Sequence, residues 1–200
     1  MKTVNVSLVG VGGQGILLTA ELLAKTAAAS GLDVKKSEIH GMAQRGGSVI
    51  SSVRFGSEVH SPIIPEGASD ILVAFDRLEA LRWAHFLAPS GKVLLNNVDI
   101  VPVTVSSGLQ QPVADLDSRL AKAFPDATVV DAQRIAEKDV GNGRTMNMVI
   151  AGALSVLTPF KESVWLKTME GSFTGAKAKL LDVNRKAFAL GRAAVASQES

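Results

Sequence analysis

The sequence predicts an α/β fold: a mostly parallel β-sheet covered by helices on both faces, with an added β-hairpin and a helical C-terminal region. Short runs of Val, Ile and Leu alternate with segments of helical periodicity over the first two thirds of the chain. From residue 131 onward, helical segments follow one another. The 200 residues have the size of one domain. We therefore expect a single domain over residues 1–195 and a flexible tail over 196–200.

The first strand is expected at residues 3–9, which are rich in β-branched residues and end in glycine. Residues 15–29 carry Leu and Ala at helical spacing, and Gly31 ends this helix. The alternating stretch 33–39 predicts a second strand, and a loop follows over residues 40–47.

The hairpin is expected at residues 48–64, which alternate with period two around Gly56 and Ser57. A compact apolar strand over 70–75 then leads into a helix over 77–87. Asp76 before that helix predicts a capping carboxylate rather than a catalytic one.

The remaining strands are expected at 92–97, at 127–132 and at an edge position over 101–105, where Pro102 cannot donate a ladder hydrogen bond. Helices are expected over the segments 116–124, 131–139, 145–157, 161–171 and 177–195. Trp165, Met169 and Phe173 form a helical stripe whose default interpretation is core packing, with a subunit contact as the alternative.

Composition excludes several function classes. The net charge is only +2 and Tyr is absent, which disfavours a nucleic-acid binder. No apolar segment is long enough to cross a membrane. The chain contains no cysteine, so it cannot supply thiolates to a zinc site, to an iron–sulfur cluster or to nucleophilic catalysis. We expect a soluble, cytoplasmic protein that contacts neither nucleic acid nor a membrane.

A glycine-rich turn follows the first strand. The segment Gly10-Val11-Gly12-Gly13-Gln14-Gly15 satisfies the G-x-G-x-x-G pattern between a strand and a helix. Such a turn lets an anion approach the backbone at a helix N-terminus, but the same glycines also permit a tight turn and close packing. Glu38 lies near the place of a ribose-binding acid, yet a second glycine loop follows it, which argues against tightly bound NAD.

That second loop contains Gln44, Arg45, Gly46 and Gly47. A guanidinium on a flexible backbone can clamp a phosphate or a carboxylate through two parallel hydrogen bonds. The alternative is an arginine that pairs with a partner subunit or with backbone carbonyls.

Taken together, these motifs resemble the gamma subunit, or gamma domain, of 2-oxoacid:ferredoxin oxidoreductases. The resemblance lies in GVGGQG, HGMAQRGGSV and HSPIIPEGASDILVAFD, and continues through FDRLEALRW, TMNMVIAGAL and NRKAFALGR. It spans nearly the whole chain, and the spacing of GxGGQG and AQRGG is more specific than either motif alone.

The resemblance implies a Rossmann-like three-layer α/β/α domain in a thiamine-diphosphate-dependent enzyme. That enzyme converts an aryl 2-oxoacid such as indolepyruvate, with CoA and oxidised ferredoxin, to the aryl-acetyl-CoA, carbon dioxide and reduced ferredoxin. It also implies that this chain has no catalytic or metal-ligating residue and helps to complete the CoA and substrate region. The residues expected there are Gly10, Gly12, Gly13, Gln14, Gly15, Gln44, Arg45, Gly46 and Gly47.

The cofactors are expected in a larger partner subunit. Besides cysteine, the thiamine signature of Gly-Asp-Gly followed by paired Asn is absent, since Gly141-Asn142-Gly143 has no acid at its centre. Thiamine diphosphate, Mg²⁺ and the iron–sulfur clusters therefore belong to the partner, and this chain alone is expected to be inactive. The alternative hypothesis is a stand-alone Rossmann-type nucleotide-binding or regulatory module.

Overall fold

The chain forms one mixed β-sheet with helices on both faces. This computed structural model describes residues 1–40 and 47–198. The sheet has six strands in the order β2-β3-β1-β4-β5-β6. Their bounds are β1 Val4–Val11, β2 Asp33–His40, β3 Ser48–Gly56, β4 Ser69–Ala74, β5 Leu87–Asn96 and β6 Thr128–Val130.

Strands β1, β4, β5 and β6 are mutually parallel, whereas β3 lies antiparallel between β1 and β2. The hairpin predicted at 48–64 is therefore wrong in its placement. Residues 57–64 form no strand, and β3 pairs instead with the preceding strand β2, from Asp33↔Gly56 to His40↔Val49. Period-two alternation identifies a strand but does not say which neighbour it pairs with.

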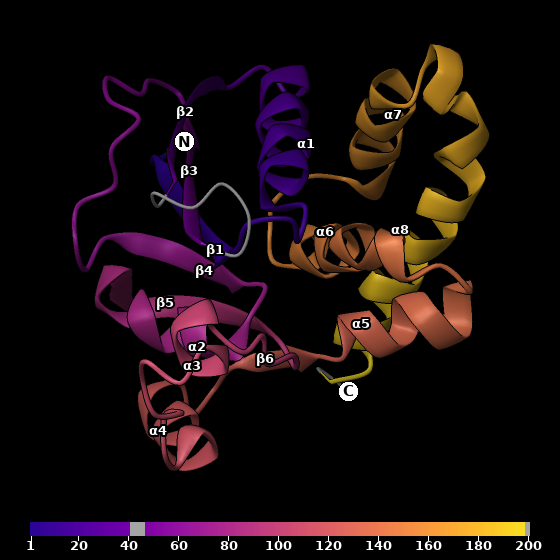
Figure 1. Ribbon diagram of the computed structural model, residues 1–200. Helices are drawn as coiled ribbons and strands as arrows, with labels where there is room; N and C mark the ends of the chain where they lie inside the picture. Colours follow the sequence, from indigo (N-terminus) through magenta and orange to yellow (C-terminus); the bar gives the residue numbers. More distant parts are fainter. Residues whose placement is uncertain (41–46, 199–200) are drawn as a thin grey trace.

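The helices form two layers. One face of the sheet carries α1 and the C-terminal helices, and the other carries α2, α3 and α4 (Figure 1). The bounds are α1 Ile16–Ala29, α2 Arg77–Arg82, α3 Val103–Ser106, α4 Leu116–Ala123, α5 Ala132–Arg134, α6 Met146–Val156, α7 Glu162–Ser172 and α8 Leu181–Ala196. This arrangement confirms the predicted three-layer α/β/α architecture.

Each face of the sheet has its own core. Val6 and Leu8 of β1 pack with α1, α6 and α8 on what we call the first face. Val9 of β1 and Ile50 of β3 pack toward α2 and α4 on the second face. Buried Trp165, on α7, belongs to the first core, which confirms the core interpretation of its helical stripe.

Two other predicted elements differ from the structure. Residues 103–106 form the short helix α3 instead of an edge strand, with Pro102 just before it, where the missing N–H of proline costs least. The helix expected over 77–87 ends at Arg82, and a 3₁₀ turn over Ala84–Phe86 leads directly into β5.

Helix α6 is the central helix of the first layer. Every residue from Met146 to Ser155 is buried. It crosses α8 at two glycines, Gly152 and Gly191, each of which lies against the backbone of the other helix. The apolar character of α6 thus serves the core, and within residues 1–40 and 47–198 no helix is long and apolar enough to span a bilayer.

Candidate functional site

The glycine turn lies at the carboxyl end of β1, where open α/β sheets bind ligands. Gly13 and Gly15 have φ angles of +107° and +83°, which side chains other than glycine rarely adopt. At Gly10, a Cβ atom would lie 2.6 Å from the Gln14 Oε1 atom and 2.8 Å from the Phe75 Cβ atom. Gly10 is therefore required by packing and Gly13 by backbone conformation. Gly15 is required by both, since a Cβ atom there would also lie 2.6 Å from the Asn147 Nδ2 atom.

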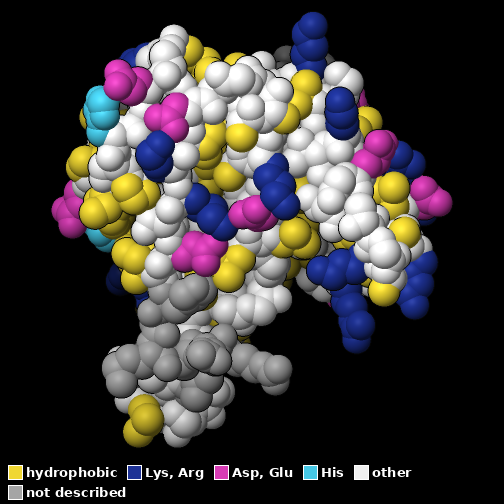
Figure 2. All heavy atoms as spheres, turned by 90° about the horizontal axis from the view of Figure 1, so that it is seen from above, with side chains coloured by type: hydrophobic (Ala, Val, Ile, Leu, Met, Phe, Trp, Pro, Cys, Tyr) yellow, Lys and Arg dark blue, Asp and Glu magenta, His cyan; other side chains and the backbone are white. Residues whose placement is uncertain are grey.

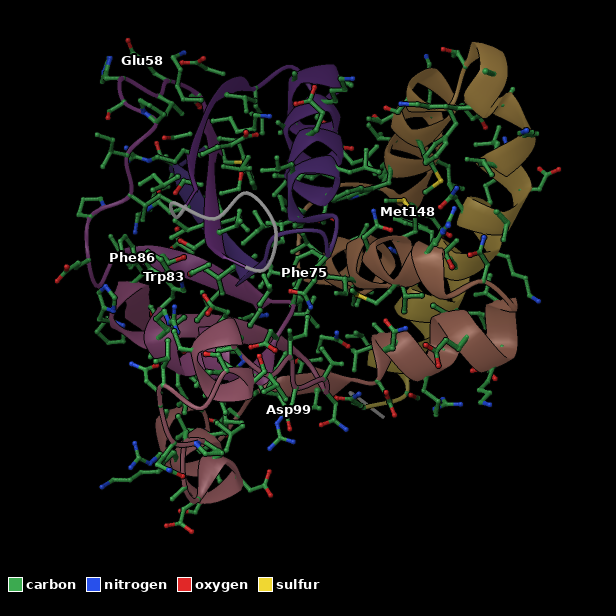
Figure 3. All side chains as sticks on the ribbon, viewed as in Figure 1. Glu58, Phe75, Trp83, Phe86, Asp99 and Met148 are labelled. Atoms are coloured by element: carbon green, nitrogen blue, oxygen red, sulfur yellow. The ribbon has the colours of Figure 1, made fainter. Side chains whose placement is uncertain are left out.

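Gln14 holds this turn to the sheet. Its Oε1 atom accepts a hydrogen bond of 2.7 Å from the Val11 N–H, and its Nε2 donates one of 2.9 Å to the carbonyl oxygen of Phe75, at the end of β4. The side chain is buried, and Phe75 lies between the sheet and the helical layer (Figure 3). Both ends of the amide are used inside the chain, so its geometry is that of a structural residue.

The two predicted glycine motifs meet in space. The Gly12 N–H donates a hydrogen bond of 2.8 Å to the carbonyl oxygen of Gly47. The other three expected residues of the second loop, Gln44, Arg45 and Gly46, lie outside the described residues. The contact places the end of that loop directly against the glycine turn.

Glu79 anchors the same end of the loop. Its buried carboxylate accepts hydrogen bonds from the Ser48 hydroxyl and, over 3.2 Å, from the Trp83 Nε1–H. Because Ser48 directly follows Gly47, helix α2 holds the start of β3 and the loop end beside the turn.

A pocket of about 520 Å³ opens on one side of the turn. The glycine turn and the start of α6 line this pocket. Its lining includes Arg144 and Asn147, which the sequence analysis did not assign to the site. The guanidinium of Arg144 has no hydrogen-bond or ion-pair partner in the described part of the chain. Asn147 is only 8% exposed, and no described residue forms a hydrogen bond with its side-chain amide.

The walls of this pocket favour an anion. Helix α1 begins there at Gly15, with no acidic residue in its first turn and no side-chain cap. Its first N–H groups are therefore free to bind a negative group, and the helix dipole and Arg144 add positive potential. A phosphate could also accept a hydrogen bond from the Asn147 amide.

A second hollow, of about 350 Å³, lies on the other side of the turn. Its walls are largely apolar and include Leu17, Leu18 and Val49. The turn therefore has Arg144 and Asn147 in the pocket on one side and aliphatic side chains in the hollow on the other, an arrangement suited to a ligand with a charged and an uncharged part.

Asp76 follows β4 at the same edge of the sheet. Its carboxylate accepts hydrogen bonds from the Glu79 N–H at 3.0 Å and from the Ile100 N–H at 2.7 Å. This confirms the predicted cap of α2 and also ties the chain after β5 to that helix. Burial raises the pKa of the Asp76 carboxyl above its usual value, against the opposing effect of these N–H donors.

A substitution tests this pKa shift. Because the folded pKa is raised above the unfolded value of 3.8, the stabilising contribution of Asp76 is complete below 3.8 and declines as pH rises through the raised value. Asp76→Asn removes this titration and the second acceptor oxygen, which serves the Ile100 N–H, at a cost of about 1 kcal/mol, whereas the amide oxygen can still cap the Glu79 N–H. We expect the stability gap between wild type and variant, measured by urea unfolding, to narrow from pH 3.5 to pH 7. The exposed Asp126→Asn is the control, and a gap that widens with pH would mean that the pKa is lowered instead.

Side chains that could bind a metal ion are scattered over the described residues. Among them, no group of three or more His, Asp or Glu side chains could hold a metal ion. His60 and His85 are exposed and lie 3.8 Å from Glu58 and Glu66, away from the glycine turn.

Comparison with known proteins identifies the family. The model of the pyruvate ferredoxin/flavodoxin oxidoreductase family matches residues 5–194. The chain belongs to this family. It is 40% identical over 194 residues to the indolepyruvate oxidoreductase subunit IorB of Thermococcus kodakarensis, with 96% of this chain and 95% of the relative covered. It is 30% identical to the ketoisovalerate oxidoreductase subunit VorA of Methanothermobacter marburgensis, covering 92% of this chain but 35% of that one.

The solved structures agree on the fold. The gamma subunit of a keto/oxoacid ferredoxin oxidoreductase from Geobacter sulfurreducens superimposes with a TM-score of 0.72 at 21% sequence identity, over 97% of this chain and 99% of that chain. The resemblance read from GxGGQG and AQRGG is thereby confirmed, and the chain is a subunit of a 2-oxoacid:ferredoxin oxidoreductase.

Proposed function

We propose that this family member is the subunit without thiamine diphosphate and without iron–sulfur clusters of an oxidoreductase that acts on indolepyruvate or another aryl pyruvate. The enzyme decarboxylates the 2-oxoacid oxidatively, transfers the acyl group to CoA, releases carbon dioxide and passes the electrons to ferredoxin. The observation that carries this proposal is the 40% identity to an indolepyruvate oxidoreductase subunit over 96% of the chain.

We assign the redox and carbanion chemistry to a larger partner subunit, which also binds ferredoxin. The 200 residues contain no cysteine and no thiamine signature, so the side chains present fit neither an iron–sulfur cluster nor the diphosphate–Mg²⁺ group. The chain alone is then inactive, and the complex is cytoplasmic in this proposal.

This chain's own contribution is the CoA region. Gly15 at the N-terminus of α1, the guanidinium of Arg144 and the side-chain amide of Asn147 line one pocket, and neither side chain has a hydrogen-bond partner among the described residues. CoA carries phosphate groups that such donors bind, and Gly47, which follows Arg45 by two residues in the sequence, contacts the same turn. Gly12, Gly13 and Gly15 allow the ligand to approach the backbone, whereas Gln14 and Gly10 build the turn.

Reconstitution tests the proposal. The chain is purified with the presumed larger subunit and assayed for ferredoxin reduction with indolepyruvate, phenylpyruvate, pyruvate and 2-oxoglutarate. We expect CoA-dependent turnover only when both subunits are present, and faster turnover with the aryl substrates. If the chain is a monomer that does not bind the larger subunit but binds NAD tightly, the result would instead support the stand-alone nucleotide-binding module.

Removing either arginine should weaken CoA binding in the complex. A charge-assisted hydrogen bond contributes about 1.5–3 kcal/mol, so we expect Arg144→Ala or Arg45→Ala to raise the KM for CoA about tenfold or more. The KM for the 2-oxoacid and the thermal stability of the chain should stay unchanged. Arg119→Ala on the distant helix α4 is the matched control, and an unaltered KM for CoA would remove the substituted arginine from the site.

A further inference from the structure

The second face of the sheet is only partly covered by helices. Helix α1 packs on β2 and β3 from the first face, whereas α2 packs on β1, β4 and β5. The register pairs Ile39 of β2 with Ile50 of β3, whose side chain belongs to the second core. Directly paired residues point to the same face, so Ile39 also lies on the second face. There it is 64% exposed.

A second exposed apolar residue lies beside the other end of β3. Arg54 is four residues from Ile50 and therefore on the same face, and its guanidinium donates a hydrogen bond of 2.8 Å to the carbonyl oxygen of Ile63. Ile63 is 68% exposed. Figure 2 shows hydrophobic side chains gathered on one side of the molecule, between two histidines.

Aromatic side chains border the same area on the side of α2. Trp83 donates to the Ser48 hydroxyl over 3.1 Å, two residues along β3 from Ile50. The Trp83 ring stacks on His85 with centroids 5.9 Å apart and meets Phe86 at 5.6 Å. Figure 3 shows Trp83 and Phe86 side by side, and both are only half-buried.

The charged groups nearby have hydrogen-bond or ion-pair partners within the chain. Arg54 donates to Asn5 and to two backbone carbonyls, and Lys35 pairs with Asp33 at 2.6 Å. His85 faces Glu66. The area thus offers apolar and aromatic groups without a free charge cluster, which suits another protein surface rather than a nucleic acid or an anionic lipid.

We propose that this area, the β2–β3 patch of Ile39, Ile63, Trp83, His85 and Phe86, is where the larger subunit docks. The inference rests on the proposed function. In the VorA relative, the matched part is 35% of the polypeptide, so most of that chain lies outside the domain. Here a separate subunit would take that place. The patch also continues through Ser48 and Gly47 to the glycine turn, where the partner's substrate must meet this chain.

Affinity measurements between the two purified full-length subunits test the proposal. Ile39→Lys and Ile63→Lys each place a charge on the patch, and the high exposure of both positions should leave the thermal unfolding midpoint unchanged. We expect each variant to weaken binding at least tenfold, and the double variant about 100-fold or more. Leu109→Lys and Leu180→Lys, at positions 79% and 40% exposed outside the patch, are the controls and should bind like wild type.

The outcomes separate the two proposals. If wild type binds the larger subunit and the patch variants bind equally well, the docking surface is wrong while the proposed function stands. If wild type does not bind the larger subunit at all, the proposed function is overturned and the docking inference falls with it. If light scattering finds a wild-type dimer that Ile39→Lys dissociates, the patch is occupied by a second copy, and the inference is likewise overturned.

Discussion

Replacing Gly152 or Gly191 by alanine is expected to destabilise the domain by about 3 kcal/mol or more. A Cβ atom at position 152 would lie 2.0 Å from the carbonyl oxygen of Phe188, and one at position 191 would lie 1.9 Å from that of Val149. These atoms belong to the backbones of two buried helices, so no side chain can rotate away. Helices α6 and α8 would have to separate, which exceeds the usual cost of about 1–3 kcal/mol for core overpacking.

The measurement is urea unfolding followed by circular dichroism. Gly171→Ala is the matched control, because a Cβ atom there meets nothing within 4 Å and the residue lies in helix α7. Alanine at that position should stabilise the protein by about 0.5–1 kcal/mol, through the lower entropy of the unfolded chain and better helix propensity. Equal effects of the three substitutions would contradict the close helix crossing.

The substitution Gln14→Glu is expected to destabilise the protein by about 2 kcal/mol at neutral pH. The carboxylate can still accept from the Val11 N–H, but it cannot donate to the Phe75 carbonyl oxygen, which lies 2.9 Å from the present Nε2. Two oxygens would then face each other in a buried place, and only Asn96 Nδ2 would still donate to that carbonyl. The cost of a buried group left without its partner is about 1–3 kcal/mol.

The pH dependence identifies the cause. Burial and the facing carbonyl should raise the pKa of the introduced carboxyl above its unfolded value, so the destabilisation is present above the raised pKa and relieved as pH falls below it. Urea unfolding at pH 4, 5.5 and 7 measures this, with the exposed Gln111→Glu as control. A variant as stable as wild type at pH 7, with weaker CoA binding in the complex, would mean that Gln14 serves the ligand instead.

The glycine turn combines two roles that the G-x-G-x-x-G pattern does not distinguish. Gly10 and Gln14 fasten the turn to the end of β4, and their contacts lie inside the protein. Gly13 and Gly15 have the left-handed conformation that opens the turn toward the pocket. The pattern is therefore partly a packing motif, and the atoms available to a ligand are backbone N–H groups.

Much of the fold could be predicted because its signals are local. The strand expected at 70–75 and the apolar helix expected at 145–157 appear as β4 and α6, and each of their bounds lies within one residue of the prediction. Strand 48–56 was also identified, but its partner was not. Pairing with β2 rather than with residues 57–64 depends on how Phe55 and Val53 reach the first core, which no local pattern records.

The candidate site, like the fold, could be predicted only in part from the sequence. Gly12 and Gly47 could be placed together as motifs, and their backbone contact agrees with that expectation. Arg144 carried no recognisable signal, and Asn147 stood out only within the segment TMNMVIAGAL. Neither could be assigned to the site, because both lie about 130 residues further along the chain. They reach the turn only because α6 packs against α1, with the Thr19 hydroxyl donating to the Asn147 carbonyl oxygen at 3.3 Å.

By itself the sequence determined most of the strands and helices, the family, and the absence of cysteine ligands for a cluster, because these depend on residue types and on spacings within single elements. Only the tertiary structure decided that Gln14 faces inward, that Arg144 and Asn147 line the pocket, and that β2 and β3 leave part of a sheet face without a helix. Those features depend on contacts between elements far apart in the chain, which form only when the side chains pack in the folded domain.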